Sequence, residues 1–174
     1  MKRNSLRITV AAVALGFAGL AAAQSQIARA DAAFLKDAAQ AGMTEIEGSK
    51  LAVSKAQSPQ VKAFADQMIT DHTKMGEQVK AMAASKNVEL PTEPSIKQKA
   101  ELKLIESAKG AEFDERYASR IGVAAHENTV KLFRKASTEA KDPEVKQLAT
   151  QALPNLEHHL KMAQDLKSSV ASAK

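Results

Sequence analysis

The sequence predicts an all-α protein, an antiparallel four-helix bundle with an extra short helix between the second and third bundle helices. Three observations support this fold. Apolar residues recur at spacings of three and four, the period of a helix that buries one face. The segments "SPQ" and "DPE" each place proline directly after a capping residue, which is a signal for a helix start. Aromatic residues make up only 3% of the chain, which disfavours a sheet.

The N-terminus is predicted to be a secretory signal peptide, residues 1–23. "MKRNSLR" is basic, and the apolar segment that follows it is too short to span a bilayer comfortably. Ala21–Ala23 then offer the small residues of a signal peptidase site. A second candidate cleavage site follows Ala30, and an uncleaved membrane anchor is the alternative interpretation.

Signal cleavage determines the expected location. Residues 24–30 form a linker and residues 31–172 form the bundle domain, with no transmembrane segment after cleavage. The protein is expected to be exported to the periplasm, either free there or peripheral to the outer membrane. Removing the signal leaves 22 basic and 20 acidic side chains, a formal charge of +2. This near balance argues against a nucleic-acid partner, and the absence of cysteine excludes disulfides, zinc ribbons and thiol catalysis.

The first two helices are predicted over residues 31–56 and from Pro59 to about Asn87. Asp31 can cap the first helix, and Ser58 can cap the second. Each helix carries one inward stripe with a polar member. In the first helix the stripe is Phe34, Ala38, Ala41, Glu45, Gly48 and Ala52, and in the second it is Val61, Ala65, Met68, His72, Met75, Val79 and Met82.

The second half begins after the proline-rich turn "NVELPTEPS". A short helix over residues 95–109 should end at Gly110 as its C-cap. The third bundle helix spans about 111–140, and the fourth runs from Asp142 and Pro143 almost to the end. A continuous helix over 95–140 would be much longer than its partners, so a break at Gly110 is expected.

An internal repeat relates the two halves. "SPQVKAFADQ" (58–67) matches "DPEVKQLATQ" (142–151) at an offset of 84, and "EIEGSKL" (45–51) aligns with "HENTVKL" (126–132). Two similar helical hairpins, related by a pseudo-twofold axis, would build the bundle. Chance similarity between helices rich in alanine and lysine is the alternative.

Three histidines and one glutamate are predicted to meet near the middle of the bundle. Glu45, His72, His126 and His159 come from four different helices, and residue counts place them within one or two turns of the same depth. His158 should face water. The orientation of His126 is open, because Phe113, Tyr117 and Ile121 form a competing apolar face on its helix.

This constellation is typical of a site for one divalent transition metal ion, with iron, zinc or copper as the candidates. Ferritin-type di-iron bundles use Glu-x-x-His pairs, which are missing here, so a mononuclear site is favoured. Met68 and Met75 flank His72 and would suit copper, or they fill the core. The alternative function is a structural or partner-binding bundle whose histidines are buried and hydrogen-bonded. An enzyme is less favoured, because no nucleophile with a base and no phosphate-binding glycine loop is visible.

Several segments resemble a known family. "FLKDAAQAGMTEIEGSKLAVSKAQSPQVKAFADQMITDHTK", "AAHENTVKLF" and "DPEVKQLATQALPNLEHHL" together are similar to the exported bacterial domain-of-unknown-function family 4142. The resemblance covers about residues 31–167. It implies a ferritin-like helical bundle and maps onto His72, His126 and His159, but it implies no established activity. Metal handling or stress protection is the role expected of a metal-binding member.

Overall fold

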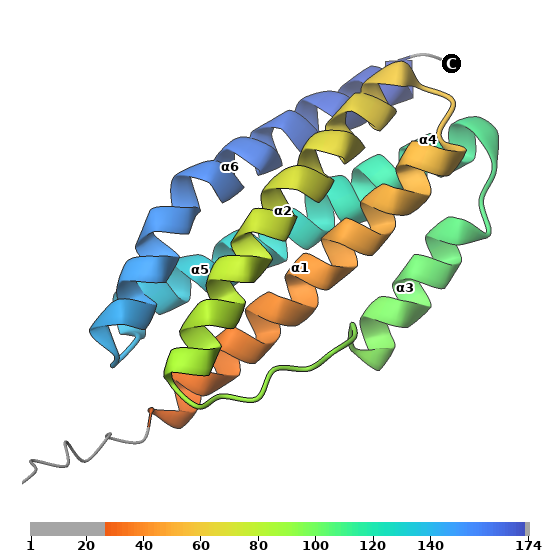
Figure 1. The fold of residues 1–174 in the computed structure, drawn as a ribbon. Helices are drawn as coiled ribbons and strands as arrows, with labels where there is room; N and C mark the ends of the chain where they lie inside the picture. The colour runs from red at the N-terminus through yellow and green to blue at the C-terminus, as the bar shows by residue number, and fades with distance from the viewer. Residues whose placement is uncertain (1–26, 173–174) are drawn as a thin grey trace, which may run out of the picture.

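The computed structural model describes residues 27–172, and nearly all of them are helical (Figure 1). This range contains no strand, which confirms the all-α prediction. The predicted signal peptide lies outside the described residues. In chain order the elements are α1 (Arg29–Lys55), α2 (Pro59–Ser85), α3 (Ile96–Glu106), α4 (Gly110–Tyr117), the π-helix η1 (Ala118–Ala125), α5 (His126–Glu139) and α6 (Pro143–Ser172).

The helices form a bundle of two hairpins. α1 packs antiparallel against α2, and the continuous segment α4–η1–α5 packs antiparallel against α6 (Figure 1). The hairpins meet where α2 contacts α6 and where α1 contacts α5. Since α2 and α5 run in the same direction, the chain must return to the other end between them. α3 makes this return along α1, at the position predicted for the extra short helix.

The helical path is interrupted between α3 and α4, near Gly110 as predicted, but Gly110 has a different role from the one expected. α3 already ends at Glu106, and Gly110 is the first residue of α4 rather than a C-cap of α3. Its φ is +60°, a left-handed conformation that glycine adopts without steric cost. The predicted break between the short helix and the third bundle helix is thereby confirmed.

Two buried aspartates connect the hairpins at opposite ends of the bundle. Asp31 does not cap α1, as the sequence predicted, because Ala28 is the N-cap. Its carboxylate instead accepts hydrogen bonds from the backbone N–H groups of Lys141 and Asp142, just before α6. Asp114, at the start of α4, accepts the corresponding bonds from Gln57 and Ser58, just before α2.

These paired contacts follow the internal repeat. Both aspartates lie in the first turns of a hairpin, and both bind the loop of the other hairpin. The loops are the "SPQ" and "DPE" segments that the sequence aligned. Ser58 and Asp142 also cap α2 and α6 as predicted, because their side chains accept from Val61 and Val145. The pseudo-twofold relation therefore extends from sequence to specific hydrogen bonds.

A polar layer divides the core into two apolar clusters. One cluster contains Phe64, Met68, Tyr117 and Leu166, and the other contains Phe34, Met75, Phe133 and Leu156, with further residues in each. On every long helical segment, one buried ionisable residue lies between the two clusters. These four residues are Glu45, His72, His126 and His159.

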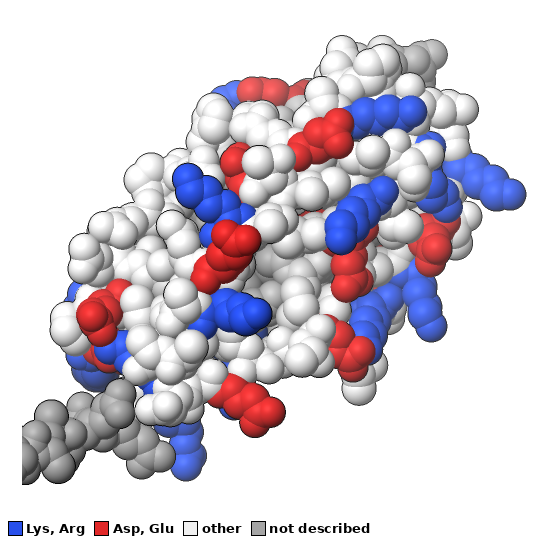
Figure 2. All heavy atoms as spheres, viewed as in Figure 1, with Lys and Arg blue, Asp and Glu red and all other residues white. Residues whose placement is uncertain are grey.

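The outer surface mixes both signs of charge. Figure 2 shows lysines and arginines interleaved with acidic side chains over the face in view, as expected of a solvated helix surface. Between residues 27 and 172, no helix combines the length and the apolar character needed to cross a membrane.

Candidate metal centre

The four predicted site residues meet at the middle of the bundle. Glu45 comes from α1, His72 from α2, His126 from the first turn of α5 and His159 from α6, and none is more than 1% exposed. His158, the neighbour of His159, is exposed, as predicted. A single layer thus takes one side chain from each long segment.

The three histidines form a compact group of potential ligands. One ring nitrogen from each lies within 4.8 Å of the others, and the Nε2 atoms of His72 and His126 are 3.2 Å apart. The ring centroids of the three pairs are separated by 5.2, 5.3 and 5.7 Å. Nitrogens this close can share one ion with only small ring adjustments.

Glu45 lies beside this group rather than within it. Its Oε2 is 3.1 Å from Nδ1 of His72, and its Oε1 is 3.8 Å from Nδ1 of His126. Oε1 also accepts a hydrogen bond of 2.9 Å from Thr129. The carboxylate therefore faces the nitrogens of His72 and His126 that are not directed at each other.

Each histidine ring has an oxygen atom close to one of its nitrogens. The Nδ1 atom of His126 donates to the carbonyl oxygen of Ile121 at 3.0 Å, and the Nε2 atom of His159 is 2.9 Å from Oδ2 of Asp71. His72 has Glu45. Histidines that bind metals typically hold their second nitrogen in this way, against a carboxylate or a carbonyl.

Asp71 contacts His159, and the sequence analysis did not identify this contact. Asp71 lies about 100° around the helix from His72, a direction that a single inward stripe would leave in solvent. Its side chain is only 29% exposed and holds His159. The reason is that α2 packs against both α1 and α6, so two of its faces are covered. A count of the neighbours of each helix, rather than one helical stripe, would have indicated this contact.

The protons on these rings follow from their partners. A carbonyl oxygen only accepts, so Nδ1 of His126 carries the proton and Nε2 presents a lone pair. The Asp71 carboxylate likewise places the proton of His159 on Nε2. Its Nδ1 is then an acceptor, and this atom is buried without a hydrogen-bond partner in the described part of the chain.

His72 cannot satisfy both of its neighbours with a single proton. If Nδ1 carries the proton, its Nε2 lone pair faces the lone pair of His126 at 3.2 Å. If Nε2 carries it, the Nδ1 lone pair faces the Glu45 carboxylate at 3.1 Å, where the two atoms are not aligned for a hydrogen bond. One pair of acceptors stays opposed in either case, which is unfavourable in a buried layer.

A doubly protonated His72 would relieve this conflict, but burial opposes it. Desolvation lowers the pKa of His72 and outweighs the opposing effect of Glu45. Desolvation, together with the neighbouring His72, also lowers the pKa of His159, to about 4. Both rings are therefore neutral near pH 7, the form in which imidazole binds a metal.

The π-helix η1 gives His126 its position. In a regular α-helix, residues nine apart differ by about 180° in direction, so Tyr117 and His126 would point to opposite sides. η1 lies between them and has more residues per turn than an α-helix. Both side chains are consequently buried, and the competing apolar face of Phe113, Tyr117 and Ile121 does not displace His126.

Comparisons with known proteins give a fold and a family but no activity. No curated protein matches this chain. A crystal structure of a DUF305 fragment from Deinococcus radiodurans is similar, with a TM-score of 0.72 and 14% identity over 82% of this chain and 98% of that one. A conserved hypothetical protein from Mycobacterium tuberculosis is also similar, with a TM-score of 0.63 and 18% identity over 80% of this chain and 91% of that one.

Both solved structures show the same fold at low sequence identity, and neither description states a function. The sequence itself matches a family description, Domain of unknown function (DUF4142), over residues 17–166. This match covers most of the chain and confirms the resemblance seen in the sequence. The chain therefore belongs to the DUF4142 family.

Proposed function

We propose that this protein binds one divalent transition metal ion through His72, His126 and His159. The three imidazoles supply the ligands, Ile121 and Asp71 orient His126 and His159, and Glu45 orients His72. The sequence had suggested Glu45 as a fourth ligand. Its contacts with the Nδ1 atoms of two histidines favour an orienting role instead.

The observation that carries this proposal is the proton conflict at His72. The oxygen partners of His126 and His159 each accept the single ring proton, so the lone pair on the other ring nitrogen receives no hydrogen bond from them. One nitrogen of His72 also keeps a lone pair without a donor. A bound cation would accept all three lone pairs, and the proton of His72 could then rest on Nδ1 beside Glu45. Every ring nitrogen in the layer would have a favourable contact.

A structural bundle without metal is the alternative function. The bonds from His159 to Asp71 and from Thr129 to Glu45 would suit it. However, three atoms in the layer, Oε2 of Glu45, Nδ1 of His72 and Nδ1 of His159, are buried without a hydrogen bond within residues 27–172. Buried polar atoms without hydrogen bonds lower the stability of the fold, and apolar side chains in their place would avoid this loss. A purely structural role therefore does not explain their presence.

Imidazole ligands suit iron, zinc and copper alike, so the donor set does not select among them. Met68 and Met75 pack in separate apolar clusters and offer no specific argument for copper. The proposed context is the periplasm, with a role in metal handling or stress protection. We also propose that the bundle is ferritin-like. A long return between two parallel helices, made here by α3, is typical of ferritin-like four-helix bundles.

Elemental analysis tests the proposal directly. The mature chain should be purified without a histidine tag, exposed in turn to iron, copper and zinc, and freed of unbound ion. The expected result is a metal-to-protein ratio near one for at least one of these metals. A ratio near zero for all three, in protein that circular dichroism shows to be folded, would favour the structural alternative.

A further inference from the structure

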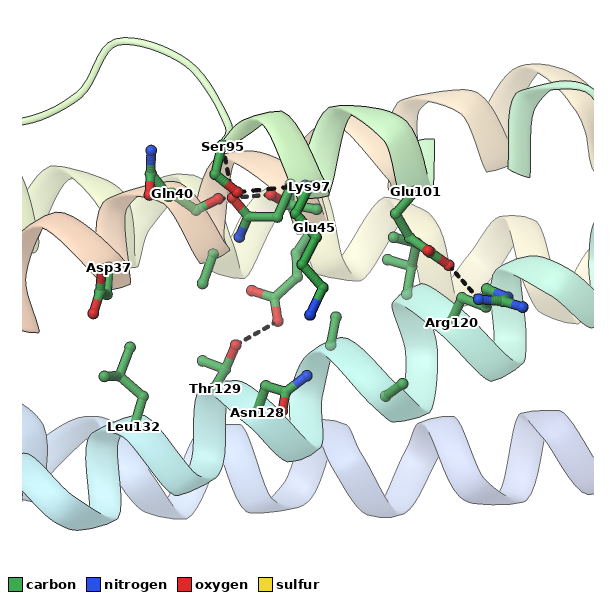
Figure 3. A pocket seen from close by; sticks show the side chains of 16 residues that line it. Asp37, Gln40, Glu45, Ser95, Lys97, Glu101, Arg120, Asn128, Thr129 and Leu132 are labelled. Atoms are coloured by element: carbon green, nitrogen blue, oxygen red, sulfur yellow. Dashed lines mark hydrogen bonds and ion pairs between the residues drawn. The ribbon is translucent and has the colours of Figure 1, made fainter. Parts of the chain in front are cut away.

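A pocket on the side of the bundle leads toward the candidate metal centre. It has a volume of about 520 Å³ and lies between α1, the start of α3 and the segment η1–α5 (Figure 3). Its lining combines apolar side chains with polar ones, which include Asp37, Gln40, Asn128 and the ion pair of Glu101 with Arg120. This space is far larger than the ~30 Å³ of one water, so it admits an ion with its hydration shell.

Glu45 belongs to both the pocket and the histidine layer. It lines the pocket and points toward Thr129 (Figure 3). Ile121, whose carbonyl oxygen holds His126, is a second lining residue. The pocket therefore reaches two direct contacts of the histidines, although the histidines themselves are at most 1% exposed.

The Glu45 carboxylate has an acceptor without a hydrogen bond on the side that faces His72. Oε1 is occupied by Thr129, but Oε2 is buried without a hydrogen-bond partner among the described residues. A carboxylate oxygen in this state attracts a cation or the water molecules that surround one. Farther out, Asp37 is exposed in the lining and adds a second carboxylate on α1.

We propose that this pocket captures a hydrated divalent cation and that Glu45 passes the ion inward to His72 and His126. This inference rests on the proposed function of the histidine site. Glu45 would have two roles in sequence. It first attracts the ion through Oε2, and it then holds His72 once the ion is bound. Small rotations of Glu45 and of the rings must accompany the transfer, since the side chains are closely packed.

A second route is conceivable on the opposite side of the layer. Asp71 contacts His159 and is 29% exposed, and Gln67 lies beside it, with Nε2 3.5 Å from Oδ2 of Asp71. However, Asp71 already engages His159 through Oδ2, the oxygen that contacts the ring. The pocket beside Glu45 is therefore the favoured route, and the two routes make different predictions.

Blocking each route in turn distinguishes them. Ala124 and Asn128 are exposed lining residues of the pocket, one turn apart, and neither belongs to the histidine layer. Tryptophan at either position, in A124W or N128W, would fill the pocket. Q67W is the matched control, because it places the same bulky side chain over Asp71. Co²⁺ serves as the probe, since its visible absorption reports coordination, and stopped-flow mixing with metal-free protein gives the uptake rate.

We expect A124W and N128W to slow Co²⁺ uptake by about tenfold or more, while Q67W changes it by less than about twofold. The final amount of bound Co²⁺ and the melting temperature should stay close to those of the unmodified protein. Equal rates in all variants, or slowing in Q67W alone, would overturn the proposed route. Failure of the unmodified protein to bind Co²⁺ would instead contradict the metal-binding function itself.

Discussion

The Nε2 atoms of His72 and His126 lie 3.2 Å apart in the centre of the bundle, between two apolar clusters. Two ligands bound to one tetrahedral ion at about 2.0–2.1 Å are separated by roughly 3.3–3.5 Å. The pair is therefore already spaced for a shared ion, and the third ring, His159, completes a three-histidine face.

Adjacent histidines in α6 provide the first test. H159Q should weaken metal binding by more than the 10–100-fold that loss of an orienting partner typically costs, because it removes a proposed ligand. H158Q is the matched control and should bind like the unmodified protein, since His158 is exposed. Isothermal titration with Zn²⁺ measures both affinities. Equal affinities in the two variants would place the metal elsewhere.

The helices and their starts could be predicted because their signals are local. Ser58 with Pro59 and Asp142 with Pro143 mark helix starts through contacts within one turn. The inward stripes follow from the helical period, and they identified the four polar residues of the layer. Depth could be counted because antiparallel helices of similar length align their middles.

The contacts around the site could not be predicted in the same way, because they depend on packing between helices. Asp71 reaches His159 only because α2 is covered on two faces. The π-helix before His126 changes the direction of every later side chain on that segment, and no pattern in the sequence predicts it. Asp31 looked like a helix cap in sequence, but it binds a loop 110 residues away.

The second prediction concerns the contact of Asp71 with His159. D71N should lower metal affinity by about 10–100-fold without unfolding the protein, because an amide holds the ring and its tautomer less firmly than a carboxylate. D66N, an exposed aspartate on the same helix, is the control. Competition with a chromophoric chelator gives both affinities. An unchanged affinity in D71N would show that Asp71 does not contribute to metal binding.

The third prediction is a pH dependence of the metal-free protein. Burial lowers the pKa of His159 from 6.5 to about 4, so the unfolded chain binds a proton between these values and the folded chain does not. Stability should therefore fall as pH decreases from about 6.5 toward 4, with a slope of up to about 1.4 kcal/mol per pH unit for this histidine. His72, whose pKa is also lowered, acts in the same direction.

Urea denaturation between pH 7 and pH 4.5 measures this slope. The metal-free H159Q variant should show a shallower decline than the unmodified protein, because one of the titrating groups is gone. Metal affinity should decrease over the same range, since protons compete for the ring nitrogens. Parallel pH profiles for the two proteins would contradict the buried, neutral state of His159.

The fourth prediction concerns the two aspartates that join the hairpins. D31A and D114A should each lower the free energy of unfolding by about 1–3 kcal/mol, because each leaves two backbone N–H groups in a partly buried loop without their acceptor. The effects should be additive, since the sites lie at opposite ends of the bundle. D37A, which removes an exposed aspartate of α1, should change stability far less. A lower free energy of unfolding in only one of these two variants would contradict the equivalent roles of Asp31 and Asp114.

The last prediction concerns where the predicted signal peptide is cleaved. α1 starts at Arg29, and the N–H of Asp31 donates to the carbonyl oxygen of Ala28. Cleavage after Ala30 would remove the first two residues of α1 and place a positive α-ammonium group at a helix N-terminus, where positive charge is unfavourable.

Cleavage after Ala23 keeps this first turn, so the mature chain should begin at Gln24. Intact-mass analysis of periplasmic extract after expression of the full sequence in a Gram-negative host measures the start. A mass that matches a chain starting at Asp31 would be consistent with export but would show that the first turn of α1 is dispensable. A mass that still contains residues 1–23 would contradict the predicted signal peptide and, with it, the periplasmic context of the proposed metal site.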